Sequence, residues 1–103
     1  MNSKIPIQYD SVVLKEVCER FYLKKLAFFG SVVRDDFKSS SDIDVLVEFK
    51  EGHTPGFIKL YELEMSLSSL FGGRKVDIVT YKALNRHLKT KVLKEAEVQY
   101  AEG

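Results

Sequence analysis

The chain has 103 residues, enough for one domain over residues 1–103 but too few for a catalytic domain plus a separate domain that encloses a small substrate. Sixteen Lys and Arg residues against fifteen Asp and Glu residues leave a formal charge of +1, which disfavours the wrapping of extended DNA or RNA. A single cysteine excludes an internal disulfide, and no segment resembles a signal peptide or a membrane span, so we expect a cytoplasmic protein.

The first predicted element is a helix. Either Asp10 or Ser11 can cap it. Apolar side chains then recur at helical spacing and define a buried stripe, made of Leu14, Val17, Cys18 and Phe21. Because Cys18 lies on this stripe, we interpret it as a core residue and not as a reactive thiol.

A strand, a tight turn and a short helix follow. The apolar run at residues 26–29 predicts a buried strand that ends at Gly30. Ser31 would then cap a short helix over residues 32–36. Residues 37–41 are polar and serine-rich, which predicts a loop.

Residues 43–49 give the clearest strand signal, because apolar side chains alternate along them. One face would point into the core, and the other would carry Asp42, Asp44, Leu46 and Glu48. Thr54 would next cap a helix with Pro55 in its first turn and a buried leucine stripe, Leu60, Leu63, Leu67 and Leu70.

The remaining elements are a strand and a helix. Gly72 and Gly73 should end the leucine-rich helix. Residues 75–80 predict a third strand, and residues 84–97 a final helix that buries Leu88, Val92, Leu93 and Ala96. This order predicts an α/β (α+β) fold with a small mixed sheet of three strands, helices mainly on one face and the other face open for a ligand.

Three aspartates are the strongest chemical signal. Asp42 and Asp44 are two residues apart and would project from one face of a strand, where close carboxylates repel unless a cation neutralises them. Asp77 interrupts an apolar strand, where a charge needs a partner or a metal. Carboxylates suit Mg²⁺ or Mn²⁺, whereas zinc favours His and Cys ligands. Together the three could hold two ions about 3.5 to 4 Å apart.

A phosphate-binding turn is the second signal. Gly30 allows the backbone to approach a phosphate, and the N–H groups after it, with the Ser31 hydroxyl, can donate to the anion. Arg34 lies one helical turn further on. Its guanidinium could contact a phosphate or lock the loop that presents the aspartates, and the sequence does not separate these two roles.

Each signal has an ordinary explanation when it is taken alone. A Gly-Ser pair before a helix is commonly only a cap. An Asp-x-Asp pair is often a solvated strand edge or part of a calcium loop. The calcium alternative is weak here, since Val45, Leu46 and Val47 stand where that loop needs oxygen ligands and a glycine. The conjunction of the signals favours nucleotidyl transfer.

These motifs resemble the minimal nucleotidyltransferases (MNT) of the DNA polymerase β superfamily, most closely the MNT antitoxins encoded beside HEPN ribonuclease toxins. The resemblance covers roughly residues 24–100 and rests on three segments, at residues 30–34, 41–49 and 76–80. It implies a polymerase β-like core and an enzyme that transfers AMP from Mg²⁺-bound ATP to a tyrosine hydroxyl of the partner toxin, which silences that toxin.

The same resemblance implies a role for each matching position. Gly30 and Ser31 match phosphate-binding residues, and Arg34 matches a basic residue that usually follows them. Asp42 and Asp44 match the metal ligands, and Asp77 matches a third carboxylate that also helps to deprotonate the acceptor. Family members often carry glycine after this arginine. This chain has Asp35 there, which leaves the loop shape and the nucleotide preference open.

Two alternative functions stay open at this point. The chain could neutralise a toxin by covering it without catalysis, or it could transfer a nucleotide to a small molecule such as an aminoglycoside. The sequence also leaves open the number of nucleotides transferred and whether the chain forms a homo-oligomer.

Overall fold

The computed structural model describes residues 6–34, 37–38 and 40–102. Asp35, Asp36 and Ser39 lie outside the described residues, so the predicted helix over 32–36 and loop over 37–41 are described only in part. The elements in chain order are helix α1 (Ser11–Arg20), strand β1 (Leu23–Phe29), the 3-10 turn η1 (Gly30–Val33), strand β2 (Ile43–Phe49), helix α2 (Phe57–Leu70), strand β3 (Val76–Thr80), the 3-10 turn η2 (Tyr81–Ala83), helix α3 (Arg86–Glu95) and strand β4 (Glu97–Ala101).

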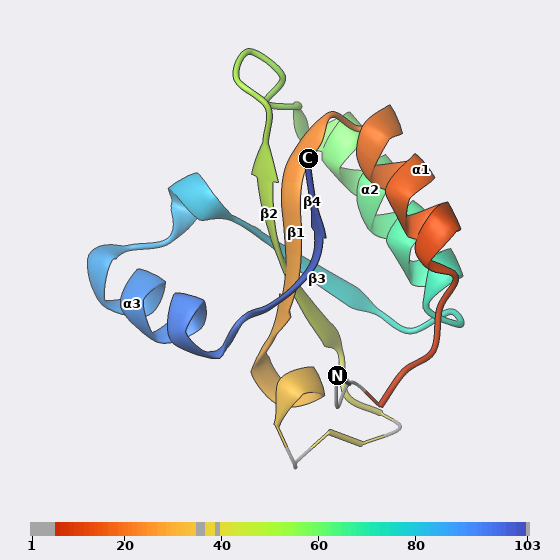
Figure 1. Cartoon of the computed structure of the whole chain (residues 1–103), viewed down its shortest axis with the longest axis vertical. Coiled ribbons are helices and arrows are strands. Elements are labelled where there is room, and N and C mark those ends of the chain that lie inside the picture. The colour runs from red at the N-terminus through yellow and green to blue at the C-terminus, as the bar shows by residue number, and fades with distance from the viewer. Residues whose placement is uncertain (1–5, 35–36, 39, 103) are drawn as a thin grey trace.

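The four strands form one mixed sheet in the order β3-β2-β1-β4 (Figure 1). β1 is antiparallel to both β2 and β4, whereas β3 is parallel to β2. The mixed α/β fold class is confirmed, but the prediction of three strands was wrong. The final helix ends at Glu95, and residues 97–101 pair with the edge of β1 as β4.

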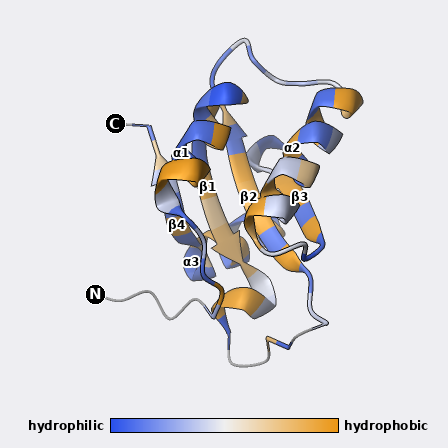
Figure 2. Ribbon diagram, turned by 90° about the vertical axis from the view of Figure 1, so that its right-hand side faces the viewer, coloured by the Kyte–Doolittle hydropathy of each residue, from blue (hydrophilic) through white to orange (hydrophobic). Residues whose placement is uncertain are grey.

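The main core lies between the sheet and helices α1 and α2, which pack side by side against one face (Figure 1). Asp10 caps α1 as predicted, because its carboxylate accepts from the backbone N–H groups of Val12 and Val13. Apolar segments of β1 and β2 occupy the middle of the fold (Figure 2). The fully buried large side chains of this core include Leu14, Leu23, Leu26, Phe28, Ile43, Val45, Val47, Leu63 and Leu67.

The other face of the sheet is partly covered, which corrects the prediction of an open face. Ala27, Leu46 and Val92 form a second, smaller cluster that α3 closes from this side (Figure 1). Leu46 is buried because α3 packs back over the strand that carries it. Leu88 and Leu93, predicted as buried, are 49% and 45% exposed, so α3 contacts the sheet along a narrower stripe than expected.

Helix α2 begins later than predicted. Gly56 is its N-cap, with no side-chain capping bond, so Thr54 is not the cap and Pro55 precedes the helix. Its end agrees with the prediction. Gly72 and Gly73 have φ of +78° and +85°, a left-handed conformation that stops the helix.

Across the described residues, no helix combines the length and the apolar character that spanning a membrane requires.

We predict that Cys18 is chemically silent in the folded protein. Burial raises the pKa of its thiol from 9.0 to about 12, with a smaller contribution from the neighbouring Glu19 charge. The folded thiol therefore stays protonated where the unfolded one ionises, and its contribution to stability is complete below pH 9.0 and declines above it. The native protein should react with a thiol reagent at pH 8 far more slowly than the chain in guanidinium. Equal rates would show that the thiol is accessible.

Candidate active site

The predicted site residues meet at one edge of the sheet, where β1 ends and β2 and β3 begin. Since β2 and β3 are parallel, their first residues lie at the same edge, with Ile43 opposite Val76 and Asp44 opposite Asp77. β1 runs the other way, and its last residue, Phe29, lies opposite Asp44. The topology therefore brings the glycine turn after β1 to the aspartates of the next two strands.

Asp44 and Asp77 share one face of the sheet because they are direct neighbours in the parallel register. The pKa of Asp44 is raised, first by burial and then by the charges of Asp77 and Asp42. Arg34 opposes this shift and Glu95 adds to it. The edge of the sheet is thus an acidic patch with Asp44 at its centre.

Asp42 lies just before β2. Its side chain is 39% exposed, and Lys75 Nζ lies 3.9 Å from its Oδ2 atom. Among the residues that the structure describes, no three acidic, imidazole or thiol side chains are positioned to hold a single metal ion. The strand register and the charge interactions with Asp44 nevertheless bring the three aspartates to one patch, in which Asp42 is also paired with Lys75.

Position 30 needs a glycine, because the backbone there lies against the Asp44 side chain. Its φ is +77°, which a residue with a Cβ rarely adopts, and a Cβ built there would overlap the Asp44 carboxylate. The absence of a side chain lets the backbone turn pass directly over the central aspartate. The sequence analysis predicted that Gly30 lets the backbone approach a phosphate, whereas the close approach that the structure shows is to the Asp44 carboxylate.

The turn itself differs from the prediction. η1 is a 3-10 turn over Gly30–Val33, so Ser31 lies inside the turn and is not its cap. The Arg34 backbone N–H donates to the Ser31 carbonyl at 3.0 Å, which closes the turn. A turn this short has little helix dipole, so any anion binding here depends on individual N–H groups and on Arg34.

Glu95 is a site residue that the sequence analysis missed. Its Oε1 accepts from the Gly30 backbone N–H at 2.7 Å, and Arg34 Nη1 lies 3.4 Å from its Oε2 and 3.5 Å from its Oε1. No motif marks this residue, because it is 65 positions from Gly30 and lies at the end of a polar helix. The only available signal was a carboxylate at a helix C-terminus, where the helix dipole disfavours it.

The chemistry of the donor set fits divalent magnesium. The patch offers carboxylate oxygens, the ligands that Mg²⁺ and Mn²⁺ prefer. Burial, and after it the charges of Asp77 and Asp42, raise the pKa of Asp44, and a bound cation would offset both effects. Asp42, Asp44 and Asp77 are the residues that would hold the metal.

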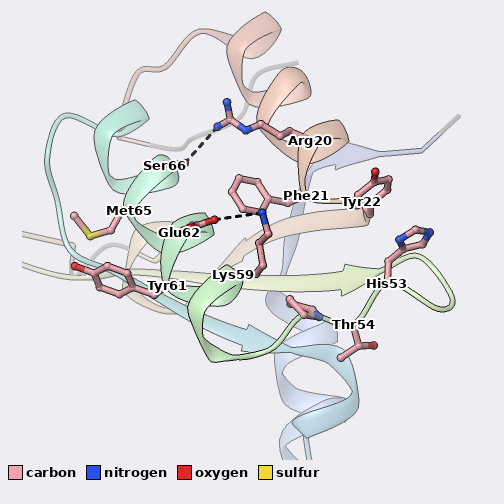
Figure 3. A pocket seen from close by; sticks show the side chains of 11 residues that line it. Arg20, Phe21, Tyr22, His53, Thr54, Lys59, Tyr61, Glu62, Met65 and Ser66 are labelled. Atoms are coloured by element: carbon pink, nitrogen blue, oxygen red, sulfur yellow. Dashed lines mark hydrogen bonds and ion pairs between the residues drawn. The ribbon is translucent and has the colours of Figure 1, made fainter.

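A separate hollow of about 560 Å³ lies away from this edge, between the end of α1, the segment before α2 and the first turns of α2 (Figure 3). Arg20 donates to Ser66 across it, and Tyr22 stacks on His53 at its rim with the ring centres 4.2 Å apart. None of the three aspartates lines it. The three aspartates and the Gly30 turn therefore lie outside this hollow.

Residues 11–99 match the family described as the nucleotidyltransferase domain, and the chain belongs to this family. It is a nucleotidyltransferase. The protein adenylyltransferase MntA of Thermococcus cleftensis is 42% identical over 81 residues, which cover 79% of each chain. A solved structure assigned as a minimal nucleotidyltransferase is 37% identical, with a TM-score of 0.69 over 84% of each chain.

A toxin-antitoxin structure with AMP-PNP shares the fold. Its TM-score is 0.72 at 21% identity, over 90% of this chain and 74% of that one.

We predict that Gly30→Ala disrupts the site. The variant combines an unfavourable φ with a clash against Asp44, so nucleotidyl transfer should fall more than about tenfold, and stability should fall by roughly 1–3 kcal/mol. Gly52→Ala is the matched control, because Gly52 has φ +81° but nothing within 4 Å of an added Cβ. It should lose some stability and keep its activity. Equal losses of activity in both variants would contradict the role of the Asp44 contact.

We also predict that Asp44→Asn stabilises the metal-free protein. The raised pKa means that the folded state disfavours the ionised carboxylate, so the favourable contribution of this group is lost as pH rises through its folded pKa. A neutral Asn avoids this cost and should raise the melting temperature at pH 7 by a few degrees in EDTA. The variant should also lose the stabilisation that Mg²⁺ gives to the wild type.

Asp42→Asn is the control for this experiment, because Asp42 pairs with Lys75 and the substitution removes that ion pair. It should leave the metal-free melting temperature unchanged or slightly lower. A lower melting temperature for Asp44→Asn in EDTA would contradict the repulsion inferred for the patch.

Proposed function

We propose that this chain is an antitoxin that transfers AMP from Mg²⁺-bound ATP to a tyrosine hydroxyl of a HEPN ribonuclease toxin, its partner, and so neutralises that toxin. The observation that carries the proposal is the register that sets Asp44 beside Asp77 under the Gly30 turn. The 42% identical relative named a protein adenylyltransferase supports a protein acceptor. A fold shared with toxin-antitoxin structures supports the class of partner.

Each residue of the edge has a separate task in this reaction. The Gly30 N–H, Ser31 and Arg34 bind the phosphates of ATP, and Asp42 and Asp44 hold the metal, with Asp77 completing the set. Bound Mg²⁺ supplies charge neutralisation of the triphosphate and activation of the attacking hydroxyl. Such positioning and electrostatic stabilisation account for most of the rate in phosphoryl chemistry.

The AMP transfer is a single displacement at the α-phosphorus of ATP. The acceptor oxygen forms a bond to the α-phosphorus of ATP while the bond from that phosphorus to the bridging oxygen of the β-phosphate breaks, and pyrophosphate leaves. The hydroxyl proton passes to Asp77, which faces the same patch as Asp44. In this proposal, residues 1–103 form one nucleotidyltransferase domain, which works in the cytoplasm, where ATP and Mg²⁺ are available.

The test incubates a HEPN-type ribonuclease toxin with the purified chain, Mg²⁺ and ATP labelled at the α-phosphate. We expect label on a tyrosine of the toxin and loss of its ribonuclease activity. The double variant Asp42→Asn, Asp44→Asn should fold and transfer at least about 100-fold more slowly, because it lacks the metal ligands. Glu62→Gln is the control, since that exposed carboxylate pairs with Lys59 on α2 and lies outside the site.

Two results would contradict the proposal. Full protection of cells by the double aspartate variant would show that covering the toxin suffices. Label on an aminoglycoside and never on protein would indicate a small-molecule nucleotidyltransferase.

A further inference from the structure

Glu95 occupies the donors that the proposed function assigns to phosphate. It is the last residue of α3, and its side chain is 25% exposed. One carboxylate oxygen accepts from the Gly30 N–H at 2.7 Å, and Arg34 Nη1 reaches both oxygens at 3.4 and 3.5 Å. A carboxylate held by a backbone N–H and a guanidinium makes the same charge-assisted bonds as a phosphate group.

Two electrostatic interactions disfavour the Glu95 carboxylate at this position. A negative charge at a helix C-terminus is repelled by the helix dipole. Glu95 also faces the acidic patch, where its charge contributes to raising the pKa of Asp44. The Gly30 N–H and Arg34 are the favourable contacts that offset both effects, so they are what holds the side chain at the turn.

Burial of Val92 holds α3 where Glu95 can reach the turn. Val92 is one helical turn before Glu95 and packs against Ala27 and Leu46 on the sheet. The carboxylate is therefore delivered by a packed helix, and the side chain can leave the turn by rotation without unpacking that helix.

We propose that Glu95 is an internal competitor of the triphosphate: its carboxylate fills the Gly30–Arg34 turn in the nucleotide-free protein, and the phosphates of the nucleotide displace it. This inference rests on the proposed function. The protein then binds a triphosphate more weakly than the unoccupied turn would, because part of the binding free energy goes into displacing the carboxylate.

The variant Glu95→Gln separates this role from a structural one. Gln keeps the size of the side chain and an oxygen that can accept from Gly30, but it loses the charge that binds Arg34. If the side chain at position 95 competes with phosphate, the weaker contact of Gln with Arg34 leaves the Gly30–Arg34 turn more accessible. The phosphates should then bind about three- to tenfold more tightly. A residue that merely orders the turn would have the opposite effect, and its loss would weaken binding.

The experiment is calorimetric titration with two probes, inorganic triphosphate in EDTA and a non-hydrolysable ATP analogue with Mg²⁺. Glu62→Gln is the matched control, because it makes the same change in net charge on α2, away from the turn. We expect Glu95→Gln to bind both probes more tightly than wild type, and Glu62→Gln to stay within about twofold of it. If Glu95→Gln does not fold, Glu95→Asp replaces it in the experiment. The shorter Asp side chain would lie farther from the Gly30 N–H, so this variant should also bind both probes more tightly than wild type.

The outcomes distinguish this inference from the proposed function. Binding by the Glu95 variants that is equal to or weaker than wild type overturns the inference and leaves the proposed function standing. A second outcome is that Glu95→Gln binds triphosphate in EDTA more tightly than wild type, while neither wild type nor variant binds the ATP analogue with Mg²⁺. That outcome supports the competitor role of Glu95 and overturns the proposed function. No binding of either probe by wild type or variant overturns both.

Discussion

The arrangement of the site depends on the parallel pairing of β2 with β3. That register places Asp44 directly beside Asp77, and the antiparallel pairing of β1 brings the end of its strand, Phe29, opposite the same aspartate. A slip of one residue in β2 would turn Asp44 towards the core and a valine towards the edge. The buried face of β2, with Ile43, Val45 and Val47, makes such a slip costly, so the apolar core fixes the position of the carboxylates.

The acidic edge carries an electrostatic cost that the proposed function would explain. Asp44 is partly buried among like charges, and the pKa of its carboxyl is raised as a result. A sequence selected for stability alone would place a neutral residue there. The Gly30 turn adds a second local cost, a left-handed backbone conformation held against that carboxylate. Both costs fall on residues to which the proposed function assigns the metal and the triphosphate.

Helix α3 links the second hydrophobic cluster to the Gly30 turn. Its buried Val92 closes the second cluster over Ala27 and Leu46, and the following turn of the helix brings Glu95 to Gly30. The chain then continues directly into β4, which pairs with β1 beside the same turn. The segment from α3 to β4 therefore both covers the sheet and sets the electrostatic state of the proposed phosphate site.

The sequence by itself determined the local features. The alternation in residues 43–49 predicted β2, and the spacing of Gly30, Asp42, Asp44 and Asp77 predicted their convergence, because strand geometry fixes which side chains share a face. Only the tertiary structure decided the rest. β4 is a short segment whose pairing depends on the free edge of β1, and Glu95 reaches Gly30 across 65 residues. Such contacts arise from the packing of distant segments, so no local pattern of residues encodes them.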